Sequence, residues 1–122
     1  MTRSARSQTN YLAGLAAEAM VARHYTQSGR RIARQRWRGT GGEIDLIIRE
    51  GDRVVFTEVK KSRTHDLAAQ RLTMRQLRRI CAAASEYVAG EPRGQSTEIR
   101  FDLATVDQAG TVRVIENISL DT

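Results

Sequence analysis

Four charged residues on two short segments have the types and spacing to bind a metal ion. Glu43 and Asp45 lie on the first segment, and Glu58 and Lys60 lie on the second. Mg²⁺ commonly takes one or two carboxylates together with water and phosphate oxygens, so this set could hold such a cation. Lys60 could alternatively neutralise the acids in a salt-bridge cluster, because ion-pair networks also gather charges.

A β-hairpin would bring the four residues together. Residues 43–49 and 53–60 have strand patterns, and Gly51-Asp52 between them is a favourable two-residue turn. If Glu50 faces Arg53, then Asp45 faces Glu58 and Glu43 faces Lys60. Directly opposed carboxylates repel, so a cation or Lys60 must offset the pair. Alternation places the four charges on one face, and the other face carries Ile44, Leu46, Ile48, Val55, Thr57 and Val59.

The rest of the chain supplies helices and strands around this hairpin. A helix is expected from Thr9 or Asn10 to about Ser28, and a second helix from Thr73 to Ala89. The remaining predicted segments are an edge strand at 30–38, a glycine turn at 39–42, a loop at 61–70 and strands at 98–107 and 111–118. The predicted order is αβββαββ, in a single domain at 9–122 after a flexible tail at 1–8.

Composition fits a globular domain with a basic surface. The 122 residues carry a formal charge of +6, and every basic residue except Lys60 and Lys61 is arginine. Arginine binds phosphate with a planar fork, which suits nucleic acid, although arginine-biased codon usage would also explain its abundance. Cys81 is the only cysteine, which excludes an intrachain disulfide and favours a reducing compartment such as the cytoplasm. No stretch reaches the roughly 18 apolar residues of a membrane span.

Two groups of arginines could contact a phosphate backbone. Arg71, Arg75, Arg78 and Arg79 have helical spacing and are expected on one side of the second helix. A second strip follows the predicted edge strand and includes Arg36 and Arg38. The alternative interpretation of both groups is a solvated surface.

Several segments resemble known families. Asp45, followed after a hairpin by Glu58-Val59-Lys60, resembles the PD-(D/E)xK signature of nucleases. Residues 10 to 118 resemble the YraN-like family of small bacterial proteins. The matching segments are Gly14 and Glu18, Gly42-Glu43-Ile44-Asp45-Leu46-Ile47, Val55-Phe56-Thr57-Glu58-Val59-Lys60, Arg100-Phe101-Asp102 and Ile115-Glu116-Asn117.

The resemblance implies a restriction-endonuclease-like core, which is an α/β fold with a mixed central sheet flanked by helices. It also implies that Asp45, Glu58 and the Val59 carbonyl bind Mg²⁺ or Mn²⁺ and that Lys60 acts on the attacking water. Glu18 matches a helix acid that completes such a site, and its alternative role is a rim acid paired with an arginine. Glu43 is either a supporting acid or a partner for Lys60.

Together these features predict a metal-dependent nuclease acting on DNA, including branched or structured DNA in repair or recombination. The expected nucleic-acid contacts are Arg36, Arg38, Arg63, Arg71, Arg75, Arg78 and Arg79, with Arg63 substituting for a basic residue that the family usually has where this chain has Ser62. A homodimer would let so small a domain cut both strands. The alternatives are a non-catalytic nucleic-acid-binding module and a protein-interaction factor.

Overall fold

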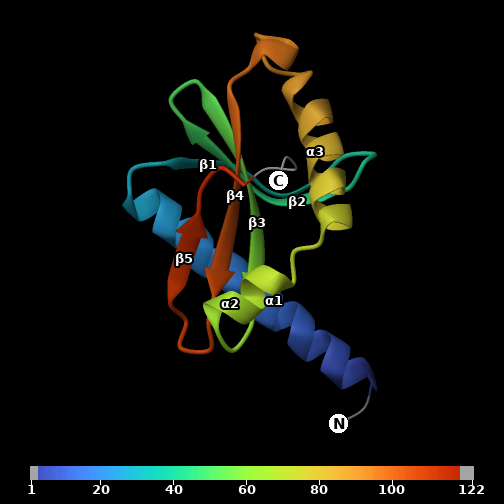
Figure 1. Cartoon of the computed structure of the whole chain (residues 1–122), viewed down its shortest axis with the longest axis vertical. Coiled ribbons are helices and arrows are strands. Elements are labelled where there is room, and N and C mark those ends of the chain that lie inside the picture. Colours follow the sequence, from blue (N-terminus) through green and yellow to red (C-terminus); the bar gives the residue numbers. More distant parts are fainter. Residues whose placement is uncertain (1–2, 119–122) are drawn as a thin grey trace.

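The computed structural model describes residues 3–118, with side chains from residue 10 onward, and has a mixed α/β architecture (Figure 1). The helices and strands are α1 Arg3–Gln27, β1 Arg31–Arg38, β2 Glu43–Glu50, β3 Arg53–Lys61, α2 His65–Gln70, α3 Met74–Val88, a 3-10 turn Gly94–Ser96, β4 Ile99–Val106 and β5 Val112–Ile115. Within residues 3–118, no helix is long and apolar enough to cross a membrane.

The strands form one sheet in the order β1-β2-β3-β4-β5. Strands β3 and β4 are parallel, whereas each of the other neighbouring pairs is antiparallel. The connection from β3 to β4 runs through α2 and α3, as a parallel pair requires a long crossover. The mixed central sheet flanked by helices is therefore confirmed, and β1 is an edge strand as its pattern predicted.

Apolar clusters lie on both faces of the sheet, because β2 and β3 are covered by a helix on each side (Figure 1). Helix α1 buries Ala17, Val21 and Tyr25 against one face. Helix α3 buries Ile80, Ala83 and Ala84 against the other. The predicted start of α3 is confirmed, since Thr73 and Gln76 form a reciprocal capping box.

Two predictions about the helices are wrong. Helix α1 begins at Arg3, so the helix does not start at the expected cap, Thr9 or Asn10. Of the expected tail at 1–8, residues 3–8 are helical and residues 1–2 lie outside the described residues. The predicted loop at 61–70 contains α2, whose start is fixed by the Thr64 side chain accepting a hydrogen bond from the Leu67 amide. A capping threonine followed by Asp66 in the first turn was a visible helix signal.

Candidate functional site

The β2–β3 hairpin has the predicted register over part of its length. The paired residues run from Glu50↔Arg53 to Leu46↔Thr57, and the ladder ends there. Beyond that point an Asp45 carboxylate oxygen accepts a hydrogen bond from the Val59 amide at 2.8 Å. A side chain thus takes the place of the next backbone contact, and the two strands begin to separate at the acids.

The prediction that Glu43 faces Lys60 is wrong, because the ladder ends before reaching them. Glu43 instead lies opposite Arg38 where β2 pairs with β1, and its carboxylate is 3.2 Å from the Arg38 guanidinium. The predicted placement of Ile44 beside Leu46 is also wrong, since Ile44 packs with Ile47 under α3. Side chains alternate strictly between the two faces only where a strand is regular, and the regular geometry of β2 is interrupted at Asp45.

Strand β1 is irregular at the same level. Arg36 and Asp45 do not pair, although the pairs on either side, Gln35↔Leu46 and Trp37↔Ile44, keep one register; the register shift of this strand pair lies between Ile32 and Arg34. Arg36 has a φ angle of +51°, in the left-handed region that non-glycine residues rarely adopt. Such strained positions concentrate at functional sites, and this one directs Arg36 toward the acids.

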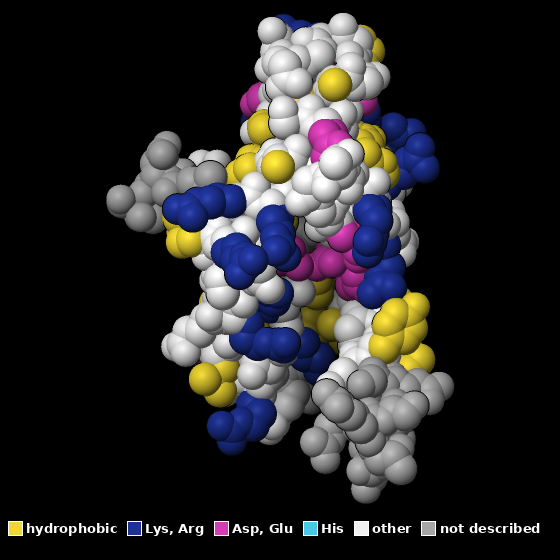
Figure 2. Space-filling view, turned by 90° about the vertical axis from the view of Figure 1, so that its right-hand side faces the viewer, with side chains coloured by type: hydrophobic (Ala, Val, Ile, Leu, Met, Phe, Trp, Pro, Cys, Tyr) yellow, Lys and Arg dark blue, Asp and Glu magenta, His cyan; other side chains and the backbone are white. Residues whose placement is uncertain are grey.

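Asp45 and Glu58 line two neighbouring pockets. The first has a volume of about 510 Å³ and is also lined by Asn10, Ala13, Gly14, Ala17, Glu18, Arg36, Val59, Lys60, Lys61 and Arg71. The second has a volume of about 420 Å³ and is also lined by Arg38, Gly39, Thr40, Gly42, Glu43, Gln76, Arg79 and Ile80. Figure 2 shows acidic side chains on the floor of this hollow and basic side chains on both of its rims.

Negative charge is poorly balanced at the floor. Burial and the neighbouring Asp45 carboxylate raise the pKa of Glu58 to about 9. Lys60 lies 4.0 Å from Glu58 and only partly offsets this effect. The acids are therefore held together at a cost that a bound cation would remove.

Glu18 joins this cluster from α1. It is buried, with 8% of its surface exposed, and burial followed by the charge of Asp45 raises its pKa. Arg36 lies 3.2 Å from one oxygen, Oε2, yet that buried oxygen has no hydrogen-bond partner among the described residues. Glu18 thus pairs with an arginine, as expected for its alternative role, but it is buried rather than at a rim, and it lines the first pocket with one oxygen unsatisfied.

The acids suit a small, hard cation that keeps some of its water. Among residues 3–118, no three Asp, Glu, His or Cys side chains gather closely enough to hold a metal by themselves. Mg²⁺ needs no such cage, because it binds one or two carboxylates and leaves other positions to water and phosphate. The acids that could serve in this way are Asp45 and Glu58, and Val59 lines the first pocket beside them.

The structure separates the predicted phosphate contacts into groups. Arg36 and Arg71 line the first pocket, together with Lys61, and Arg38 and Arg79 line the second. Arg63, Arg75 and Arg78 are exposed and line neither pocket. The four-arginine helical stripe is wrong at Arg71, which caps the end of α2 and donates to the Lys61 carbonyl.

Glu86 is a residue that the sequence reasoning missed. Its carboxylate accepts hydrogen bonds from the amides of Thr40 and Gly41, at 2.9 and 2.8 Å, and these bonds lower its pKa. A Cβ at Gly41 would lie 2.8 Å from the Ala82 Cβ, so the glycine permits this loop to dock on α3. The docked loop leads into β2, where Glu43 and Asp45 lie. In the sequence, only the glycine run at 39–42 indicated that this loop could approach another element closely.

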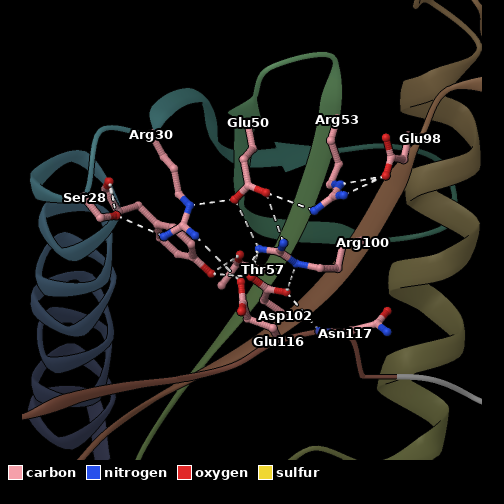
Figure 3. Close-up of polar contacts among 11 residues, drawn as sticks. Ser28, Arg30, Glu50, Arg53, Thr57, Glu98, Arg100, Asp102, Glu116 and Asn117 are labelled. Carbon is pink, nitrogen blue, oxygen red and sulfur yellow. Dashed lines mark hydrogen bonds and ion pairs between the residues drawn. The ribbon is translucent and has the colours of Figure 1, made fainter.

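A second cluster of charges lies at the other end of the sheet (Figure 3). Arg100 donates to both oxygens of the buried Asp102 carboxylate, at 2.8 and 3.0 Å. Asp102 also accepts bonds from the Tyr25 hydroxyl and the Asn117 amide. Asp102 is therefore a buried hydrogen-bonding residue that lines neither pocket.

Comparison with known proteins identifies the family. A family model described as "Uncharacterised protein family UPF0102" matches residues 17–106. The chain belongs to the UPF0102 family. This confirms the YraN-like resemblance. The matched region contains β1 to β4 and all the acids of the two pockets.

Individual UPF0102 relatives match nearly the whole chain. A UPF0102 protein of Cereibacter sphaeroides (strain ATCC 17029) is 59% identical over 110 residues, covering 90% of this chain and 94% of the relative. A UPF0102 protein of Ruegeria pomeroyi is 52% identical over 114 residues, covering 93% of each. One from Dinoroseobacter shibae is 45% identical over 118 residues, covering 97% of this chain and 88% of the relative.

Proposed function

We propose that this UPF0102 protein is a metal-dependent phosphodiesterase that acts on nucleic acid, with DNA as the expected substrate. The observation that carries the proposal is the acid pair Asp45 and Glu58, with Lys60 beside it, on the floor of a hollow with basic rims. A buried acid pair that repels itself is unfavourable for stability. Its presence in a cleft beside a lysine fits a catalytic site better than a structural ion pair.

The proposed cation ligands are Asp45, Glu58 and the carbonyl of Val59. Asp45 is held in place by the Val59 amide, so these two residues are already fixed relative to each other. A divalent cation bound there would lower the pKa of a bound water and neutralise charge on the phosphate. Glu18 would support this site from α1, on the side where its unsatisfied oxygen lies.

The remaining residues have roles that follow from their charge. Lys60, 4.0 Å from Glu58, is placed to orient the attacking water and to stabilise negative charge on the phosphate oxygens. Arg36, Lys61 and Arg71 would hold the backbone on one side of the cleavage position. Arg38 and Arg79 would hold it on the other side.

The proposed core is restriction-endonuclease-like. Three antiparallel strands follow the first helix, and a crossover with helices leads to a strand parallel to β3. This order supports the proposal because it places the E-x-K strand in the centre of the sheet and exposes its acids at one end. Helix α2 is an addition to the order expected from the pattern.

Calorimetric titration with Mn²⁺ is the first test, with the wild type beside Asp45→Asn. We expect binding by the wild type and its loss in Asp45→Asn, because the amide removes one of the two anionic ligands. Glu43→Gln is a matched control, since it removes a nearby carboxylate that is paired with Arg38. Equal Mn²⁺ binding by the wild type and Asp45→Asn would contradict the proposed ligands.

Cleavage of labelled DNA with Mn²⁺ is the second test. We expect activity in the wild type and in Glu43→Gln, and loss of activity in Lys60→Ala and Asp45→Asn. Unchanged cleavage in those two variants would identify a contaminating nuclease. Metal binding and salt-sensitive DNA binding without any cleavage would instead favour the non-catalytic binding module, whose basic rims are the same.

A further inference from the structure

The first pocket has one wall made of small side chains. This wall is formed by α1, and we call it the α1 shelf; it consists of Asn10, Ala13, Gly14 and Ala17. Their spacing of three and four residues places them on one face of the helix. The adjoining sides of the pocket carry Lys60, Lys61 and Arg71, so cationic groups stand opposite a flat helix surface.

Gly14 lies in the helix interior, where glycine is less favourable than other residues. A Cβ built at Gly14 would meet no atom within 4 Å, so no neighbour in the described structure requires glycine there. Because glycine has no side chain, it leaves space above the α1 shelf on the side that lines the pocket. Unlike Gly41, it is explained by a ligand that approaches the helix rather than by packing within the protein.

An aromatic ring stands beside the shelf. Tyr11 is 54% exposed, whereas Tyr25 and Phe56 are buried and the remaining aromatic side chains are partly buried. The Arg36 guanidinium lies 5.2 Å from the Tyr11 ring centroid, and its Nη1 atom lies 3.4 Å from the Tyr11 hydroxyl. Arg36 is held there by its left-handed backbone and by Glu18. Tyr11 and Arg36 together form the Tyr11–Arg36 platform, which meets the first pocket at Arg36, one of its lining residues.

We propose that the α1 shelf and the Tyr11–Arg36 platform bind an unpaired nucleotide next to the phosphate at the acid pair. The base would stack on the platform, and the sugar would pass over Gly14, with its phosphate toward Lys61 and Arg71. A base inside a duplex has both faces covered by its neighbours, so this site selects single-stranded or locally unpaired nucleic acid. The inference rests on the proposed function, and it names the substrate feature that the site recognises.

The experiment measures binding without cleavage. The full chain is titrated, in chelator, into a short fluorescein-labelled oligothymidylate and into a blunt labelled DNA duplex, and the anisotropy is recorded. We expect the wild type to prefer the single strand. Gly14→Leu fills the shelf and should weaken single-strand binding by about tenfold or more, within the range of one lost base–aromatic stack. Duplex binding should be unchanged.

Matched variants distinguish a loss of binding at the proposed site from a loss of the fold. Ala16→Leu adds the same side chain to an exposed position of α1 outside the pocket, and it should bind like the wild type. Gly14→Leu should melt at the same temperature as the wild type or higher, because leucine favours helix over glycine. Tyr11→Phe keeps the ring and should bind single strands normally, whereas Tyr11→Leu should lose about as much as Gly14→Leu.

Each outcome decides the inference. Unchanged single-strand binding in Gly14→Leu, or equal loss for the single strand and the duplex, would overturn it. Failure of the wild type to bind either DNA would also overturn it. Selective loss in Gly14→Leu and Tyr11→Leu supports it. This holds even if no metal-dependent cleavage is found, in which case the proposed catalysis fails and the nucleotide site stands.

Discussion

Two clusters of acids lie on the α1 side of the sheet in the described structure, and they are organised in opposite ways. In the cluster around Asp102, each carboxylate is met by arginine, and bonds from Arg30 and Arg100 outweigh burial and lower the pKa of Glu50 (Figure 3). In the pocket cluster, burial and neighbouring acids raise the pKa of Glu18 and of Glu58. The first cluster is balanced by arginines, whereas in the second Arg36 and Lys60 only partly offset the acids.

This difference separates structural charge from charge kept for binding. The Asp102 cluster ties α1, β2, β4 and the segment after β5 through Tyr25, Glu50, Arg100 and Asn117. Its bonds are made when the chain folds, so it contributes to stability. The pocket cluster opposes folding in the absence of a cation and gains stability when one binds. Opposite effects on stability should therefore follow when an acid is removed from each cluster.

The largest expected effect is a loss of stability in Asp102→Ala. Removing this carboxylate takes one partner from Arg100, which keeps Glu50 and Glu116, and one from the Tyr25 hydroxyl, which keeps Thr57; breaking a buried pair costs at most about 3–5 kcal/mol. Urea unfolding followed by circular dichroism measures the change. Asp102→Asn should lose less, because it keeps hydrogen-bonding atoms in place. A loss below that of Glu98→Gln, an exposed partner of Arg53, would show that the cluster is not structural.

Asp45→Asn should change the free energy of unfolding in the opposite direction and stabilise the protein. Removing the charge of Asp45 relieves Glu58, while the asparagine oxygen can still accept the Val59 amide bond. We expect the free energy of unfolding at neutral pH, in chelator, to rise by about 1–2 kcal/mol. The same urea titration measures it. If Mn²⁺ is added, the wild type should gain stability and Asp45→Asn should not; destabilisation of Asp45→Asn in chelator would contradict the comparison.

The pH dependence of stability should sharpen the contrast. The pKa of Glu58 is raised from 4.5 to about 9. Between these values the folded protein holds a proton that the unfolded chain has released, so the free energy of unfolding falls as pH rises. Glu18 contributes in the same direction. Urea midpoints in chelator, from about pH 5 to about pH 9, should decline in the wild type and decline less in Glu58→Gln; identical slopes would contradict the assignment.

Local patterns predicted most of the fold. The turn at Gly51-Asp52, the capping threonine Thr73 and the strand patterns each act over a few residues, so the sequence identifies them directly. The predicted start of α1 was wrong because residue types that cap helices also occur inside them, and the helix begins at Arg3. Helix α2 was missed because six residues are too short for periodicity to reveal.

The candidate site was predictable from the sequence only where the strands keep regular pairing and side-chain alternation. The hairpin register predicted that Asp45 faces Glu58 in the ladder; the ladder ends at Leu46↔Thr57, but the two acids still line the same pockets. The same register failed for Glu43 and for Ile44. The failure has one cause, the interruption of pairing at Asp45 and Arg36. Interactions between distant elements, such as Glu86 with the 39–42 loop, depend on the packed fold, and the glycine run does not identify the residue that the loop contacts.

The smallest expected effect on stability concerns Arg79, on the rim of the second pocket. No ion pair joins Arg79 to another described residue, whereas Arg53 pairs with Glu50 and Glu98 at 3.0 and 2.7 Å. Arg79→Ala should therefore change the free energy of unfolding by no more than about 0.5 kcal/mol. It should weaken DNA binding severalfold and reduce the slope of log affinity against log salt by about 1, as expected for one lost phosphate contact.

Two other arginine variants calibrate that result. Arg75→Ala removes an exposed charge from the same helix outside either pocket, and Arg53→Ala removes a paired charge from the structural cluster. Arg75→Ala should leave both stability and the salt slope near those of the wild type. Arg53→Ala should lower stability by about 0.2–1 kcal/mol and leave DNA binding unchanged.

If Arg75→Ala and Arg79→Ala weaken binding equally, DNA lies along the outer face of α3, and the second pocket has no separate role. If only Arg79→Ala does, the rim charges that lack internal partners are the ones that meet phosphate.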